Sequence, residues 1–188
     1  MSTKKRCSWV VTDPLYIKYH DLEWGVPVYD DARLFEFLIL ETFQAGLSWI
    51  TVLRKRENFR KAFDDFDYQK IAAYGDEEFD VLIQNAGIIR KKLKIKAQIT
   101  TAQEFIEVKK DFGTFSKFIW GFVAGKPIKN KYTSMNQVPA NTDLSDIISK
   151  DLKKRGFKFV GSTVVYAHMQ ATGMVNDHAT NCFRYDAV

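Results

Sequence analysis

Glu41-Thr-Phe-Gln-Ala-Gly-Leu-Ser-Trp49 directly follows a run of residues, 34–40, in which only Glu36 is not apolar. At helical spacing the side chains of this run form one wide apolar face, so Glu41 falls in the last turns of an otherwise apolar helix. A carboxylate there opposes the helix dipole, and its burial is costly unless it is paired. Two interpretations stay open. Glu41 reaches solvent at the helix end, or it lines a pocket in which Trp49 is one wall.

Capping residues extend this pattern into a succession of helices. Asp30 or Asp31 caps the helix that contains Glu41, Gly46 ends it, and Ser48 caps a second helix from Trp49 to about residue 62. The other helices are predicted at about 15–21, 67–74, 77–84, 89–110, 115–124, 142–154 and 162–173, with a loop at 125–140. Alternation of period two is not sustained, so we expect little sheet.

The fold class that we expect is all-α, with about eight to ten helices. We expect residues 1–188 to form one domain of two helical lobes, in which the N- and C-terminal segments pack together. The hydrophobic content of 46% and the aromatic content of 14% provide a substantial core and exclude a largely disordered chain.

The net charge and the hydropathy of the chain limit the kinds of binding partner and the cellular location that we expect. The net charge is +5 and the pI is about 9.1. A basic balance favours an anionic partner such as nucleic acid, although a solvated lysine face explains any single cluster equally well. No apolar run approaches the roughly 20 residues that a membrane-spanning helix needs. No apolar segment follows the basic residues 4–6 as in a secretion signal, so we expect a cytoplasmic protein. The sequence has no coiled-coil heptads, and we expect a monomer.

Two cysteines and two histidines lie near the chain ends, Cys7 and His20 at the start and His178 and Cys182 at the end. The H-x3-C spacing of the second pair places both side chains on one face of a helical turn. Cysteine and histidine are preferred zinc ligands, and four of them form a closed site that stabilises structure. The alternative is two buried free thiols and two ordinary histidines. His168, on an apolar helix, is expected to be a hydrogen-bonded core residue.

A basic turn joins two of the predicted helices, Lys153-Lys-Arg-Gly-Phe-Lys-Phe-Val-Gly161. Glycines let the main chain approach a ligand closely, and the amides at the start of the next helix face an anion. Such a turn suits DNA backbone phosphates, which position a protein without reading sequence. The alternative is a basic helix C-terminus followed by an ordinary glycine turn.

Six segments in order along nearly the whole chain make it resemble the 3-methyladenine DNA glycosylase I family of helix-hairpin-helix DNA glycosylases. They are Asp13-Pro-Leu-Tyr-Ile-Lys-Tyr-His20, Glu23-Trp-Gly-Val-Pro27, Gln44-Ala-Gly-Leu-Ser-Trp49, Asn85-Ala-Gly-Ile-Ile-Arg90, Lys154-Arg-Gly-Phe-Lys-Phe-Val-Gly161 and Val175-Asn-Asp-His178. The resemblance implies the helix-hairpin-helix glycosylase fold. It also implies one structural Zn2+ per chain, held by Cys7, His20, His178 and Cys182, which joins the two ends.

The resemblance further implies a base pocket with Glu41 as the catalytic carboxylate, Tyr19 and Trp49 against the base, and Tyr16 and Trp24 nearby. The pocket takes a damaged base that has been extruded from the duplex.

For DNA binding, the resemblance implies that Leu47 wedges into the duplex, while the basic turn contributes Arg155, Lys158 and Gly161. Bifunctional relatives carry a lysine nucleophile just past the last glycine of this turn. Ser162 follows Gly161 here, so we expect no lyase activity.

The implied reaction is hydrolysis of the N-glycosidic bond of 3-methyladenine in alkylated duplex DNA during base-excision repair, with free 3-methyladenine as product. N3-methylation gives the base a positive charge, which aromatic faces and a carboxylate would both stabilise. Two alternatives stay open: a non-catalytic DNA-binding module that senses damage, and an enzyme of the same fold that prefers another alkylated base.

Overall fold

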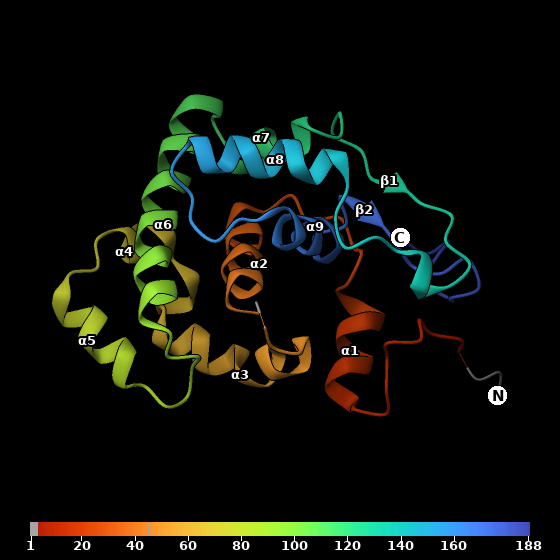
Figure 1. The fold of residues 1–188 in the computed structure, drawn as a ribbon, viewed down its shortest axis with the longest axis horizontal. Helices are drawn as coiled ribbons and strands as arrows, with labels where there is room; N and C mark the ends of the chain where they lie inside the picture. The colour runs from red at the N-terminus through yellow and green to blue at the C-terminus, as the bar shows by residue number, and fades with distance from the viewer. Residues whose placement is uncertain (1–3, 45) are drawn as a thin grey trace.

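The computed structural model describes residues 4–44 and 46–188, and Figure 1 shows that they fold mainly into helices. The helical elements are α1 (Pro14–Leu22), α2 (Asp31–Gln44), α3 (Trp49–Ala62), η1 (Asp64–Phe66), α4 (Tyr68–Ala72), α5 (Asp76–Gln84), α6 (Lys92–Phe112), α7 (Phe115–Gly121), η2 (Met135–Gln137), α8 (Asp143–Lys154) and α9 (Ser162–Ala171). Strands β1 (Ile128–Lys129) and β2 (Val175–Asn176) pair in parallel. The prediction of a mainly helical protein with little sheet is confirmed.

Helix α2 runs through the middle of the molecule (Figure 1). Every residue from Leu34 to Phe43 is buried, as expected for an apolar helix that other helices enclose. It packs against α3, α6, α7 and α9. The Asp30 carboxylate caps its start by accepting from the amide of Arg33 at 2.9 Å, which confirms one of the two predicted caps. The Asp31 carboxylate instead accepts from the amide of Ser116 at 2.8 Å, at the start of α7.

Two predicted helices differ from those in the structure. The long helix begins at Lys92 instead of about residue 89, because Ile88 and Ile89 are buried in the preceding loop. Leu93, an apolar residue in the first turn of this helix, is 76% exposed. Residues 178–182 form turns after β2 and no helix, so the expectation that a helical turn carries His178 and Cys182 is wrong.

The turn between α8 and α9 is held by side chains from both helices. Ser149 Oγ donates to the carbonyl of Val160 at 2.6 Å, and the hydroxyls of Ser145 and Ser162 lie 2.7 Å apart. The backbone of Gly156 has φ +102°, a left-handed conformation that favours glycine. These contacts fix the turn on the core, with its cationic residues at the surface.

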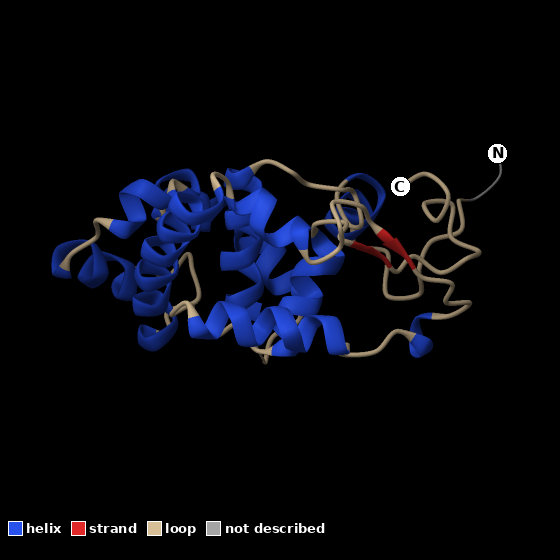
Figure 2. Ribbon diagram, turned by 90° about the horizontal axis from the view of Figure 1, so that it is seen from above, coloured by secondary structure: helices blue, strands red, loops and turns tan. Residues whose placement is uncertain are grey.

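The first described residues, from residue 4 on, and the C-terminal segment lie on the same side of the molecule, beside the β1–β2 pair (Figure 2). The amide of Phe183 donates to the carbonyl of Lys5 at 2.9 Å. Among the described helices, none combines the length and apolar character that crossing a membrane requires.

Candidate active site

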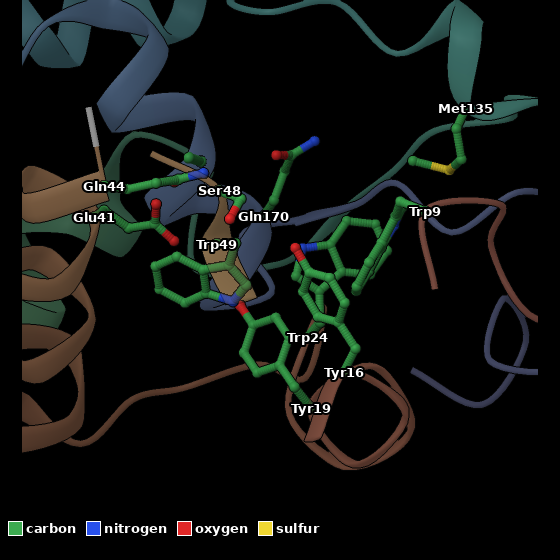
Figure 3. A pocket seen from close by; sticks show the side chains of 11 residues that line it. Trp9, Tyr16, Tyr19, Trp24, Glu41, Gln44, Ser48, Trp49, Met135 and Gln170 are labelled. Atoms are coloured by element: carbon green, nitrogen blue, oxygen red, sulfur yellow. The ribbon is translucent and has the colours of Figure 1, made fainter. Parts of the chain in front are cut away.

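A cavity of about 290 Å³ lies where α1, α2, α3 and α9 meet (Figure 3). Its buried floor consists of Tyr19, Trp24, Glu41 and Trp49. Its rim is more exposed and consists of Trp9, Tyr16, Gln44, Ser48, Met135, Ala167 and Gln170. The structure therefore brings together all five residues that were predicted for the base pocket. Ala45, within the Gln44–Trp49 segment, lies outside the described residues.

Glu41 is 4% exposed, although it carries a carboxylate. Its Oε2 atom has no hydrogen-bond partner in the described part of the chain. Burial raises the pKa of Glu41 to about 8, because the charged form loses its hydration. Of the two interpretations of Glu41, the structure supports the pocket and contradicts the solvent-exposed helix end. A buried acid with a raised pKa inside a cavity is typical of a functional site.

Aromatic rings form most of the remaining wall. The rings of Tyr19 and Trp49 lie 5.5 Å apart at 51°, directly beside Glu41 (Figure 3). The indole Nε1 of Trp49 is buried and finds no acceptor among residues 4–44 and 46–188. Unlike the Trp49 indole nitrogen, the Tyr16 hydroxyl has a partner, because it accepts a hydrogen bond of 3.2 Å from the amide of Ile50 at the start of α3. The floor thus offers flat apolar faces, one unpaired donor and one unpaired acceptor.

The sequence did not single out Trp9, Gln44, Met135 or Gln170 as site residues. The ring centroids of Trp9 and Trp24 lie 5.1 Å apart. Trp9 comes from the segment before α1 and forms part of the cavity rim. Gln44 is one turn after Glu41 on α2, so helical spacing could have identified it. The others come from distant segments, and no local signal marks them.

The residues predicted to touch DNA lie at or near the surface, but carboxylates of the protein already engage the side chain of one of them. Leu47 is 36% exposed in the turn between α2 and α3. Lys158 is exposed on the α8–α9 turn, and Gly161 precedes α9 as its N-cap.

Arg155 is the residue whose side chain is already engaged. It bonds Asp151 Oδ1 at 2.7 Å and Asp111 Oδ2 at 3.0 Å, so carboxylates of the protein already engage its guanidinium.

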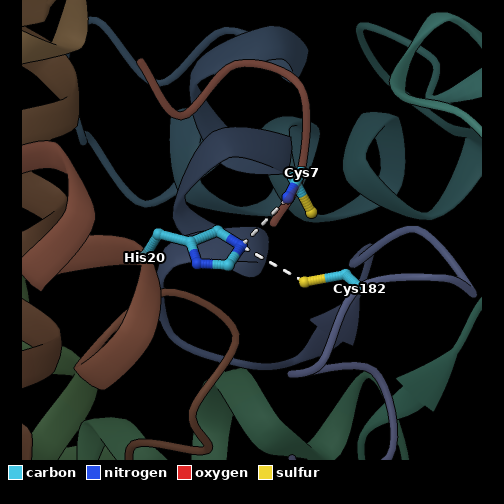
Figure 4. Close-up of side chains that lie close together, drawn as sticks. All are labelled: Cys7, His20 and Cys182. Atoms are coloured by element: carbon cyan, nitrogen blue, oxygen red, sulfur yellow. Dashed lines mark hydrogen bonds between the residues drawn. The ribbon is translucent and has the colours of Figure 1, made fainter. Parts of the chain in front are cut away.

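A second cluster of polar residues joins the chain ends (Figure 4). The ligand atoms of Cys7, His20 and Cys182 all lie within 4.8 Å of one another, and the three residues are buried. Nε2 of His20 is 3.4 Å from Cys182 Sγ, while its Nδ1 is 2.8 Å from Asp21 Oδ1. A carboxylate on one ring nitrogen orients a histidine for metal binding through the other. Hydrogen bonding from Cys7 outweighs burial and, with His20, holds the pKa of Cys182 below its ordinary value.

His178 is not part of that group of three, but it is adjacent. Its ring centroid is 5.1 Å from that of His20. Its Nδ1 is 3.0 Å from Asn176 Oδ1, and its buried Nε2 has no partner among the described residues. Burial lowers its pKa to about 3, so the ring is neutral, as a metal ligand must be. These donors are chemically suited to zinc.

His168 is a core residue, as predicted. It is 2% exposed, and its Nε2 bonds the carbonyl of Leu34 at 3.0 Å.

Solved structures with this fold are available. A crystal structure of 3-methyladenine DNA glycosylase I (TAG) has a TM-score of 0.93 and 52% identity, covering 95% of this chain and 98% of that chain. A structure that addresses 3-methyladenine recognition by 3-methyladenine DNA glycosylase I from Staphylococcus aureus has a TM-score of 0.93 and 36% identity, covering 97% of each chain. The fold of this chain is therefore that of a DNA glycosylase.

Sequence comparisons define the family. DNA-3-methyladenine glycosylase 1 of Escherichia coli (strain K12) is 51% identical over 181 residues, which is 96% of this chain and 97% of that protein. DNA-3-methyladenine glycosylase of Haemophilus influenzae is 48% identical over 177 residues, 94% of this chain and 96% of that protein. The family model for methyladenine glycosylases matches residues 9–185. The chain belongs to the methyladenine glycosylase family.

Proposed function

We propose that this protein hydrolyses the N-glycosidic bond of 3-methyladenine in alkylated duplex DNA and releases the free base. The observation that carries the proposal is the Glu41 carboxylate, buried without a cationic partner among the described residues and flanked by Trp49 and Tyr19. A flat cationic base supplies the positive charge that the ionised form of Glu41 lacks, whereas a neutral ligand does not. Family membership supports the same substrate.

Binding would use the floor of the cavity. The faces of Trp49 and Tyr19 hold the cationic ring, each contact contributing about 0.5–2 kcal/mol. Tyr16 and Trp24 complete the apolar wall. Glu41 accepts a hydrogen bond from the base edge, and this bond is stronger in the dry cavity than it would be in water.

The chemistry then requires little acid assistance, because the methylated base already carries positive charge. The bond between the base nitrogen and the sugar carbon breaks, and its electron pair neutralises the base. The oxygen of a water molecule bonds to the sugar carbon, and the proton that it loses passes to solvent. Ser162 follows Gly161 where a lyase would need a lysine, which supports a monofunctional enzyme.

DNA would lie across the surface that carries Leu47 and the turn between α8 and α9. Leu47 wedges into the duplex where the base leaves it, and Lys158 and the backbone at Gly161 meet phosphates. Arg155 contributes less than its sequence position indicates, because Asp111 and Asp151 already neutralise it.

The test is release of free 3-methyladenine from methylated duplex DNA. Wild-type protein should release the base. Glu41→Gln should be slower by about 10- to 100-fold, since a hydrogen bond to a charged group contributes about 1.5–3 kcal/mol. Glu107→Gln, an exposed glutamate on α6, is the matched control and should keep wild-type activity. A wild-type protein that releases no base would refute the proposed reaction, and full activity in Glu41→Gln would refute the role of the carboxylate.

We also infer that Cys7, His20, Cys182 and His178 hold one structural Zn2+. The zinc would supply coordinate bonds between the N- and C-terminal segments, and four protein ligands would leave no position for a substrate water. Asp21 and Asn176 orient the two histidines through their Nδ1 atoms, which leaves both Nε2 atoms free for the metal.

Metal analysis of purified protein tests this assignment. We expect about one zinc ion per chain, lost in Cys182→Ser together with much of the thermal stability. Ser8→Ala, at an exposed position beside Cys7, should keep both. If the wild-type protein contained no metal and were still fully stable, the cluster would consist of two free thiols and two ordinary histidines.

A further inference from the structure

Asp177 is a second acid without a cation, behind the rim of the cavity. It is 1% exposed. Its Oδ1 accepts from Asn130 Nδ2 at 2.6 Å, and its Oδ2 accepts from the Tyr166 hydroxyl at 2.7 Å and from Gln170 Nε2 at 2.8 Å. No lysine or arginine in the described chain forms an ion pair with it. Three neutral donors therefore hold a buried carboxylate group, and one of them, Gln170, lines the cavity.

This contact fixes the orientation of the Gln170 amide. A carboxylate only accepts hydrogen bonds, so the NH₂ group of Gln170 must face Asp177. The amide oxygen Oε1 is then the group left to face the cavity. The main chain is anchored as well, because the carbonyl of Gln170 accepts from the amide of Gly25 at 3.0 Å. The rim thus presents a positioned acceptor (Figure 3).

The depth of the cavity indicates what this acceptor meets. The buried floor around Glu41 and Trp49 takes the base under the proposed function, so the sugar carbon and the attacking water lie at the level of the rim. Gln170 is partly exposed and belongs to the rim. An acceptor there faces the water and the sugar, not the edge of the base.

We propose that Gln170 is a catalytic residue that holds the attacking water through Oε1, and that Asp177 is a positioning residue that fixes Gln170. This inference rests on the glycosylase reaction proposed above. The water donates one hydrogen to Oε1 and directs its oxygen lone pair at the sugar carbon. As the new carbon–oxygen bond forms and the base leaves with its electron pair, the water becomes positively charged and loses a proton to solvent. The amide dipole of Gln170, which Asp177 holds in place, stabilises that positive charge without reorganising.

Single-turnover excision from methylated duplex DNA, together with titration of free 3-methyladenine, tests the proposal. Gln170→Leu removes the acceptor and should lower the single-turnover rate constant by about 10- to 100-fold. Its affinity for free 3-methyladenine should be unchanged, because the floor is intact. Asp177→Asn keeps the shape but replaces one accepting oxygen with an NH₂ group, and should also lower the rate constant without changing base affinity. Gln103→Leu, at an exposed position on α6, is the matched control and should behave as wild type.

Each other outcome has a defined meaning. A Gln170→Leu protein with wild-type rate overturns the proposal. A parallel loss of rate and of base affinity also overturns it, because Gln170 would then recognise the base. Full activity in Asp177→Asn beside an impaired Gln170→Leu removes Asp177 from the proposal. If wild type releases no base at all, the proposed function fails and this inference fails with it, whereas an active wild type with active variants refutes this inference alone.

Discussion

Two glutamates on the same helix are treated in opposite ways. Glu36 and Glu41 are five residues apart on α2, and each is 4% exposed. Glu36 accepts from Arg33 at 2.6 Å and from Arg56 at 2.8 Å, and lies 2.7 Å from Arg60 Nη2. Burial opposes its ionisation, but the arginines outweigh burial and lower the pKa of Glu36.

Glu41 has no such neighbours among the described residues, and burial alone raises its pKa to about 8. The comparison teaches that burial does not distinguish a structural acid from a functional one. The partners do. A carboxylate that the fold has already neutralised stabilises the fold, whereas one left without a cation is available to a cationic ligand.

Removing one of the arginines that pair with Glu36 should have the largest effect on stability. Arg56→Met leaves Glu36 short of one buried partner, so we expect the free energy of unfolding to fall by about 3–5 kcal/mol. Urea denaturation measures this. The control is Arg54→Met, whose side chain is 64% exposed and pairs with Asp13, and it should cost at most about 1 kcal/mol. If the two variants were equally stable, the arginine cluster would not be what neutralises Glu36.

The pH dependence of stability should separate the two acids. The pKa of Glu41 rises from an ordinary 4.5 to about 8 on folding. The folded state therefore favours its protonated form, and the stability contributed by this group is complete below pH 4.5 and lost as pH rises toward 8. By pH 7 the loss is about 3 kcal/mol.

Glu36 works in the opposite direction, because its lowered pKa means that stability is lost as pH falls. Comparing unfolding free energies of wild type and Glu41→Gln between pH 5 and pH 7 isolates the Glu41 contribution. Parallel curves would mean that the Glu41 carboxylate is not desolvated in solution.

Lys94 extends the comparison, because it is a buried lysine that binds the backbone at the end of α2 and forms no ion pair with a carboxylate of the described chain. Its Nζ donates to the carbonyls of Thr42 at 2.7 Å and Phe43 at 3.3 Å, at the end of α2. We expect Lys94→Met to cost about 1–3 kcal/mol, measured by thermal unfolding. The pH dependence that Glu41 contributes should survive. Lys96→Met, at an exposed position, should be nearly neutral. Loss of that pH dependence in Lys94→Met would show that the lysine and the carboxylate are coupled.

Local signals predicted the helices well, because caps act within a few residues. Asp13, Thr114 and Thr142 each accept a hydrogen bond from the first turn of the helix that follows them. The errors arose where tertiary burial overrides local periodicity. Ile89 packs into the core from a loop, and Cys182 reaches the cluster from a turn.

In the candidate site, too, the residues with a local sequence signal were predicted, and those brought in by tertiary packing were not. Glu41 was recognisable because a charge directly after an apolar run, in the last turns of the same helix, is a local anomaly, and the family motifs supplied the aromatic residues. The bond between Asn130 and Asp177 spans 47 residues, and Trp9 meets the cavity across the fold. No pattern in one sequence marks such contacts, because they depend on how the helices pack.

The raised pKa of Glu41 also has a thermodynamic consequence for ligand uptake. With a pKa of about 8, the empty floor is close to electrically neutral at pH 7. An arriving cation would draw the carboxyl into its ionised form and expel about one proton into the medium. The heat measured for such an encounter would then vary with the ionisation enthalpy of the buffer, and a neutral purine would produce no such variation. The negative charge of Glu41 would thus form mainly when a cationic ligand binds.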